Sequence, residues 1–203
     1  METLKRAAAA GFMIGIGAVI YLQCENKIVG ALLFTIGLFA ICAFGMNLFT
    51  GKIGYVISNK NKPNCLIIWL GNLIGTAVGM ILIRIARPSL HEKARALMNA
   101  KMELNVFSVI ILAFFCGVLM YIAVENYRAN PHGFGKIIGL FLCVSVFILC
   151  GFEHSIADMC YAVLAVNSFE TGLKYLLFLI EVTVGNSLGA LAIRAVTFKK
   201  EQV

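Results

Sequence analysis

The sequence predicts an all-α membrane protein with six transmembrane helices, arranged as an inverted repeat of three plus three helices. Hydrophobic residues make up 61% of the 203 residues and charged residues only 13%, a balance far from that of soluble domains. At about 20 residues per span, the chain has room for about six spans. We therefore expect a single transmembrane domain over residues 1–203, with no separate soluble domain.

Six apolar stretches can be recognised as candidate spans, and two of them are unusual. The stretches cover residues 7–23, 28–57, 64–87, 104–124, 136–166 and 171–197. The second and the fifth are too long for one plain span, and each is interrupted near its middle, by Gly45 to Gly51 and by Gly151 to Asp158. Such interruptions favour discontinuous helices, whose unpaired backbone groups are tolerated only where they line a cavity or are buried in protein.

The two halves of the chain repeat the same order of elements. The third stretch carries GNLIG at 71–75 and the sixth carries GNSLG at 185–189, and in each half this motif follows the interrupted stretch. Residues 7–87 and 104–197 are thus the two predicted repeats. Because three spans are an odd number, the second repeat enters the membrane from the opposite side, which places the functional site near the midplane between the two breaks.

The basic residues indicate how the chain is oriented. With both termini inside, ten Lys and Arg residues lie on the inner side and seven on the outer side, which favours a cytoplasmic membrane location with both termini in the cytoplasm. The net charge of +7 gathers at span ends, so it indicates anchoring at the bilayer surface and attraction of anions, with no nucleic-acid partner. The connection 88–102 has helical composition and is predicted to lie along the outer surface.

The segment 151–159 reads GFEHSIADM and brings three ionisable side chains into an apolar stretch. Such groups at membrane depth usually face a pathway or a partner, so we expect a transport site with His154 at its centre. Imidazole titrates near neutral pH and can donate a hydrogen bond or a proton. The alternative is that His154 only bridges two helices by a hydrogen bond.

Three carboxylates at membrane depth have two interpretations each. Glu153 satisfies backbone donors at the break or contacts the substrate. Asp158, four residues after His154, shares a helix face with it or makes a helix-packing hydrogen bond. Glu181 is a proton relay or a protonated group paired with a neighbouring span.

The segment 151–159, together with LFT at 48–50 and the two Gly-Asn motifs, resembles the formate/nitrite transporter family over nearly the whole chain. The resemblance implies an aquaporin-like fold and a homopentamer with one pore in each protomer. It also implies that the substrates are small monovalent anions or their conjugate acids, such as formate, nitrite and hydrosulfide.

The same resemblance assigns residues to the pore. His154 matches the central histidine, Thr50 its partner on the second-span break, Lys101 a lysine at the outer mouth, and Asn186 an asparagine of the sixth span. The predicted constrictions are Leu38, Leu48 and Phe49 on the inner side and Phe34 and Phe147 on the outer side. This chain departs from the family at Gly117 and Asp158, where asparagine is common, and at Glu181, which is usually uncharged.

These assignments predict a channel or proton-coupled transporter for small monovalent anions, with protons and the lipid bilayer as its other partners. An anion that crosses apolar constrictions loses several kcal/mol or more of hydration, and protonation removes most of that cost. Lys101 would attract anions and His154 would supply a titratable group between the constrictions.

An intramembrane metal-dependent enzyme or a metal-cation transporter that uses Glu153, His154 and Asp158 is the alternative function. A metal site of this kind would have no second histidine at membrane depth, because His91 and His132 fall in connections. The chain also lacks a nucleophile and base at recognisable spacing, so we expect neither an enzyme nor a cofactor.

Overall fold

The computed structural model describes residues 1–58 and 62–197, and every regular element in these ranges is helical. The elements are α1 (Glu2–Gln23), α2 (Lys27–Ala43), α3 (Phe49–Lys52), η1 (Ile53–Ile57), α4 (Cys65–Ala86), α5 (Ser89–Met102), α6 (Val106–Ala129), α7 (Gly133–Leu149), α8 (Ser155–Ala165) and α9 (Phe169–Thr197). Lys60, Lys199 and Lys200, which contribute to the predicted charge bias, lie outside the described residues.

Four helices within the described ranges are long and apolar enough to cross a membrane, namely α1, α4, α6 and α9. The helices α2, α7 and α8 are apolar but shorter. They arise because the second and fifth apolar stretches are interrupted, as predicted: α2 ends at Ala43 before α3 begins at Phe49, and α7 ends at Leu149 before α8 begins at Ser155.

The two interruptions have the same backbone geometry. Gly45 and Gly151 lie just beyond the ends of α2 and α7 with φ angles of 63° and 66°, a left-handed conformation that glycine adopts without steric cost. The amide that follows each glycine donates to a carbonyl five residues back, Met46 to Ile41 and Phe152 to Phe147, both at 2.9 Å. This is the Schellman ending of a helix, so the sequence ends both helices by one local mechanism.

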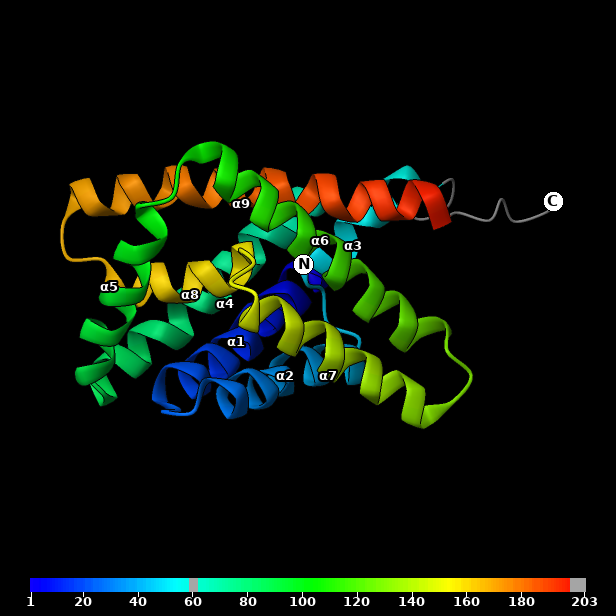
Figure 1. The fold of residues 1–203 in the computed structure, drawn as a ribbon, viewed down its shortest axis with the longest axis horizontal. Helices are drawn as coiled ribbons and strands as arrows, with labels where there is room; N and C mark the ends of the chain where they lie inside the picture. Colours follow the sequence, from blue (N-terminus) through cyan, green and yellow to red (C-terminus); the bar gives the residue numbers. More distant parts are fainter. Residues whose placement is uncertain (59–61, 198–203) are drawn as a thin grey trace.

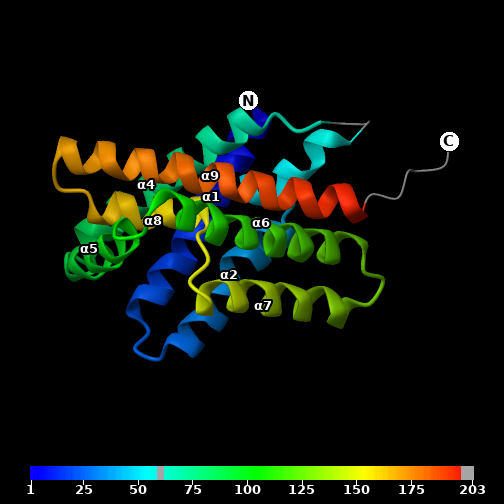
Figure 2. The same ribbon diagram turned by 45° about the horizontal axis from the view of Figure 1, so that its top comes forward.

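The two halves also pack in the same way. Helix α1 packs against α2 and α4, and α6 packs against α7 and α9. Figures 1 and 2 show α9 running beside α6, with α7 on the other side of α6. Helices α2 and α7 contact each other and join the halves.

Gly117 belongs to a close helix contact. A Cβ atom on Gly117 would lie 2.1 Å from the Asn186 carbonyl oxygen, and one on Gly11 would lie 2.1 Å from the Asn72 carbonyl oxygen. No side chain fits at this distance, so α6 approaches α9 only because residue 117 is glycine. Gly117, one of the departures from the family pattern, therefore has a packing role in this contact.

Helix α5 lies against α8 (Figure 1). Leu90, Ala94 and Met98 are fully buried at helical spacing, and His91 Nδ1 lies 2.7 Å from the Leu164 carbonyl oxygen. The connection 88–102 is helical, as its composition predicts, and one face of α5 is part of the core. This packing carries Lys101 to the break between α7 and α8.

Candidate functional site

The Asn72 side chain holds the first break. Phe49, the first residue of α3, donates its backbone N–H to Asn72 Oδ1 at 2.8 Å. Asn72 Nδ2 donates to the carbonyl oxygens of Ala7 at 2.8 Å and Asn47 at 2.9 Å. One amide thereby satisfies two backbone groups that the break leaves without helical partners, the Phe49 N–H and the Asn47 carbonyl, and ties them to α1 through Ala7.

Asn186 holds the second break with the same three kinds of bond. Ser155, the first residue of α8, donates its N–H to Asn186 Oδ1 at 2.9 Å, and Asn186 Nδ2 donates to the carbonyl oxygens of Ala113 and Glu153, both at 2.8 Å. Asn186 is fully buried and lines neither cavity described below. Asn186 therefore positions the second break, and its assignment to the pore stays a prediction.

His154 lies at the start of α8, where its ring makes two hydrogen bonds. The backbone N–H of Ala157 donates to His154 Nδ1 at 3.0 Å, so the imidazole caps the helix. His154 Nε2 lies 2.9 Å from Thr50 Oγ1. Because Nδ1 accepts a hydrogen bond, the ring proton of the neutral imidazole is on Nε2 and is donated to the Thr50 hydroxyl. The Thr50 hydroxyl hydrogen then remains available for another acceptor.

This arrangement joins residues from the two breaks, as predicted. Thr50 follows the first break and His154 ends the second, and both side chains are almost completely buried. Helix capping also explains the ring orientation, since the helix N-terminus presents an N–H and would repel a protonated Nδ1. The pair therefore presents hydrogen-bond donors rather than a ready cation.

Two aromatic rings lie over His154 on one side. The Phe147 ring stacks on the imidazole with 5.4 Å between centroids and 21° between planes, and Phe34 meets Phe147 edge-on at 6.1 Å. Both rings line a small cavity of about 80 Å³ that also includes His154, Lys101 and Asp158. One water needs roughly 10–15 Å³ of such space, so the cavity suits several waters or one small ion.

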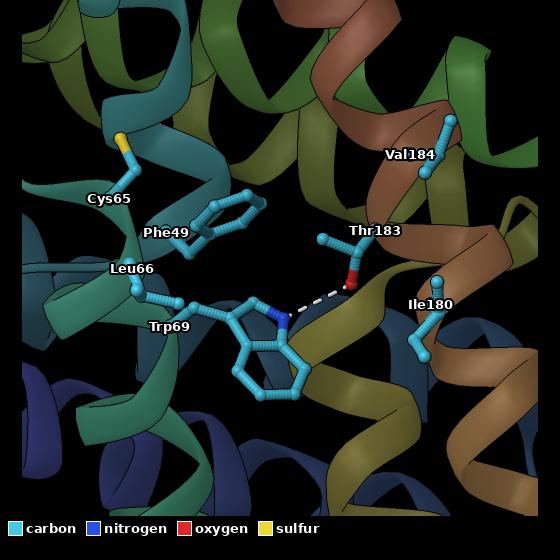
Figure 3. Close-up of a pocket in the computed structure, with 7 residues that line it drawn as sticks. All are labelled: Phe49, Cys65, Leu66, Trp69, Ile180, Thr183 and Val184. Atoms are coloured by element: carbon cyan, nitrogen blue, oxygen red, sulfur yellow. Dashed lines mark hydrogen bonds between the residues drawn. The ribbon is translucent and has the colours of Figure 1, made fainter.

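The predicted inner constriction residues are buried near the first break. Leu38 and Leu48 are each 1% exposed and Phe49 is 5% exposed. Phe49 also lines a second, apolar cavity of about 340 Å³ between α4 and α9. Figure 3 shows Phe49 and Trp69 on one side of it and Thr183 on the other, with the Trp69 indole donating to Thr183 Oγ1 at 3.1 Å.

Lys101 forms buried ion pairs with two carboxylates. Its ammonium nitrogen contacts Glu153 Oε2 and lies 3.1 Å from Asp158 Oδ1. The side chains of Lys101, Glu153 and Asp158 are 14%, 3% and 1% exposed. Lys101 is thus paired with two carboxylates and lines the same cavity as His154, and its place at the outer mouth stays a prediction.

This cluster bears on the expectations about both carboxylates. Glu153 directs its carboxylate to Lys101, and the backbone donor at the break is taken by Asn186 instead. Asp158 lies in the first turn of α8, which His154 caps, and both side chains line the same cavity. The partner of Asp158 is Lys101.

Glu181 lies at a half-buried position of α9 and lines neither cavity. Its role as a proton relay or paired group stays a prediction.

The side chains proposed as metal ligands in the alternative function, Glu153, His154 and Asp158, are engaged by other groups of the protein. Lys101 engages both carboxylates, and the two nitrogens of His154 are engaged by Ala157 and Thr50. Within residues 1–58 and 62–197, no three His, Cys, Asp or Glu side chains group as metal ligands.

Sequence reasoning missed three residues of the site. Tyr21 and Tyr161 line the His154 cavity, and no pattern distinguishes them from other aromatic residues of apolar stretches. Asn72 was visible as the counterpart of Asn186 in the repeated Gly-Asn motif, and this symmetry was the signal for its role.

Comparisons with known proteins agree with these features. The sequence matches the profile described as formate/nitrite transporter over residues 1–199. Similar proteins include the formate channels FocB (26% identity, 75% of this chain and 62% of the relative) and FocA (24%, 78% and 64%) of Escherichia coli strain K12. An uncharacterized transporter, YrhG of Bacillus subtilis strain 168, is 27% identical over 89% of this chain and 75% of its own length.

Solved structures show the same fold. A pentameric formate channel with formate bound superposes with a TM-score of 0.82 at 23% identity, covering 96% of this chain and 94% of that chain. An ion channel of the FNT family gives 0.80 at 21% identity, covering 96% and 86%. The chain spans just under two thirds of the length of FocB and FocA. Because the family profile covers almost all of it, this chain belongs to the formate/nitrite transporter family.

Proposed function

We propose that this protein is a channel or proton-coupled transporter for small monovalent anions and their conjugate acids. Formate is the first candidate, since the similar proteins FocA and FocB are named formate channels, and nitrite and hydrosulfide are the next. The observation that carries the proposal is the buried His154–Thr50 pair, with the Phe147 ring stacked on the imidazole and the Phe34 ring edge-on to Phe147.

The chemistry of this site suits a weak acid. An anion between the apolar rings of Phe34 and Phe147 has lost hydration that those rings do not replace. The Thr50 hydroxyl, whose oxygen accepts from His154 Nε2–H, offers its own hydrogen to an oxygen or sulfur atom at that point. Protonation of the substrate lowers the remaining barrier, so proton movement accompanies the anion.

The equivalent bonds of Asn72 and Asn186 support the inverted-repeat architecture as part of this proposal. In it, α2 with α3 and α7 with α8 form two broken spans, which complete six spans with α1, α4, α6 and α9. Leu38, Leu48 and Phe49 narrow the inner half of the path. The protein lies in the cytoplasmic membrane with both termini inside. It is a homopentamer, like the solved formate channel that it resembles in fold.

Reconstitution into liposomes tests the proposal. We expect uptake of radiolabelled formate far above that of empty liposomes, with competition by nitrite and hydrosulfide and weaker competition by the bulkier acetate. An inward proton gradient is expected to accelerate uptake. Native mass spectrometry of the same preparation checks the pentamer. Formate uptake no faster than in empty liposomes, from a correctly assembled protein, would overturn the proposed function.

A further inference from the structure

The cluster at the second break contains one cation and two carboxylates. Lys101 contacts both Glu153 and Asp158, and all three side chains are nearly inaccessible to solvent. If every group were ionised, the cluster would carry a net negative charge beside the cavity that we propose for an anion. Burial makes such an uncompensated charge costly, and like charges at short distance favour protonation of one carboxyl group.

Among residues 1–58 and 62–197, the groups that surround Asp158 include no cation besides Lys101. Those on the elements packed around it are Tyr21 of α1, Lys101 of α5, Cys116 of α6, Glu153 before α8, and His154, Cys160 and Tyr161 around α8. His154 accepts a hydrogen bond from Ala157 through Nδ1 and is neutral in this arrangement. A proton is therefore the remaining means of balancing the second carboxylate.

The geometry shows where this proton can lie. Asp158 Oδ1 faces Lys101, while the buried Oδ2 receives no hydrogen bond from the described part of the chain. The Asp158 and Glu153 carboxyl groups lie beside each other, because both contact the same Lys101 ammonium nitrogen. Of the two, Asp158 lines the cavity that contains His154.

We propose that Glu153 and Asp158 share one proton beside Lys101, and that Asp158 donates it to the anion of a small weak acid held in the His154 cavity. This inference rests on the proposed function. In the step, the O–H bond of Asp158 breaks and an O–H bond forms on a formate oxygen. Neutral formic acid leaves, the Asp158 carboxylate remains paired with Lys101, and a proton from water restores the pair.

Infrared spectroscopy tests the shared proton independently of transport. The purified wild-type protein at neutral pH is expected to show the carbonyl band of a protonated carboxyl group. The band disappears in Asp158→Asn and also in Glu153→Gln, because either change leaves one carboxylate for one lysine. Glu170→Gln, at an exposed site of α9, is the matched control and retains it. Absence of the band from the wild type, or its persistence in Glu153→Gln, would overturn the shared proton.

Formate flux in liposomes tests donation. Positioned proton donors contribute roughly 10²–10⁴-fold to reactions, so we expect Asp158→Asn to lower flux by about tenfold or more. Asp158→Glu keeps an acidic group and is expected to exceed Asp158→Asn. A purely structural role predicts the reverse order, because asparagine matches aspartate in shape and glutamate does not. Pentamer yield is measured for each variant. If Asp158→Asn assembles poorly, Glu153→Gln replaces it in the flux assay, because it also lacks the shared proton.

The outcomes separate the two proposals. Wild-type protein that carries no formate would overturn both. Donation by Asp158 would be overturned if Asp158→Asn carried formate as fast as the wild type. It would also be overturned if Asp158→Asn carried formate faster than Asp158→Glu. In both cases the proposed function would stand.

Discussion

Asn72 and Asn186 make the same three hydrogen bonds at matching points of the two halves. Each accepts from the first backbone N–H of a short helix and donates to two carbonyl oxygens, one in the broken segment and one in the first helix of its half. Both side chains are fully buried. The hydrogen bonds of the two side-chain amides therefore determine where α3 and α8 begin. They thereby position Thr50 and His154.

The first prediction is that Asn72→Ala and Asn186→Ala destabilise the protein by similar amounts. Each change leaves the first N–H of a short helix and one carbonyl oxygen of the broken segment without their buried partner, at roughly 1–3 kcal/mol per group, so we expect a clear fall of the unfolding temperature in detergent. Asn99→Ala, at an exposed site of α5, is the control and has little effect. An unchanged unfolding temperature in either buried variant would show that water replaces the amide.

The second prediction concerns the contact between α6 and α9. Gly117→Ala places a Cβ atom 2.1 Å from a backbone oxygen, so the helices must separate, and overpacking of this kind costs about 1–3 kcal/mol or more. We expect a lower unfolding temperature and a reduced pentamer yield on gel filtration. Gly133→Ala is the matched control, since a Cβ atom at that position would meet no other atom within 4 Å. Equal behaviour of the two variants would contradict the packing role.

The sequence was sufficient to locate the breaks because their cause is local. Gly45 and Gly151 are each followed by polar residues inside an apolar stretch, and the observed Schellman endings require only a glycine and its neighbours. The repeated Gly-Asn motif contains both asparagines, although only Asn186 was singled out from the sequence. A sequence does not show which backbone groups an amide binds, so the bonds of Asn186 to the second break required the structure.

The Lys101–Asp158 pair shows the limit of sequence reasoning. Both residues were recognised separately, one as an attractor of anions and the other as a departure from the family. Their pairing depends on how α5 packs against α8, a tertiary relationship that periodicity does not encode. The sequence did contain one signal for this pairing. It places more carboxylates than cations at membrane depth, and a buried charge requires a partner.

The third prediction isolates the Thr50 hydroxyl. Thr50→Val keeps the shape of the side chain but removes the acceptor for His154 Nε2–H, and a hydrogen bond of this kind contributes roughly 0.5–1.5 kcal/mol. We expect formate flux to fall about two- to tenfold, with recovery in Thr50→Ser. Thr35→Val is a matched control, because Thr35 is equally buried and its hydroxyl has no hydrogen-bond partner among the described residues. Similar losses in Thr35→Val and Thr50→Val would mean that flux reports general packing.

The fourth prediction separates the two tasks of His154. His154→Asn retains an acceptor that caps α8, whereas His154→Phe leaves the Ala157 N–H without its partner, at a cost of about 0.5–2 kcal/mol. Asparagine in the capping position is too short to reach Thr50 as well, so both variants lose the contact between the two breaks. We therefore expect formate flux to fall strongly in both, while only His154→Phe lowers the unfolding temperature. Flux is compared at matched pentamer yield. Normal flux in His154→Phe would leave the histidine as a helix cap alone, and substantial flux confined to His154→Asn would show that a hydrogen-bond donor at this position suffices.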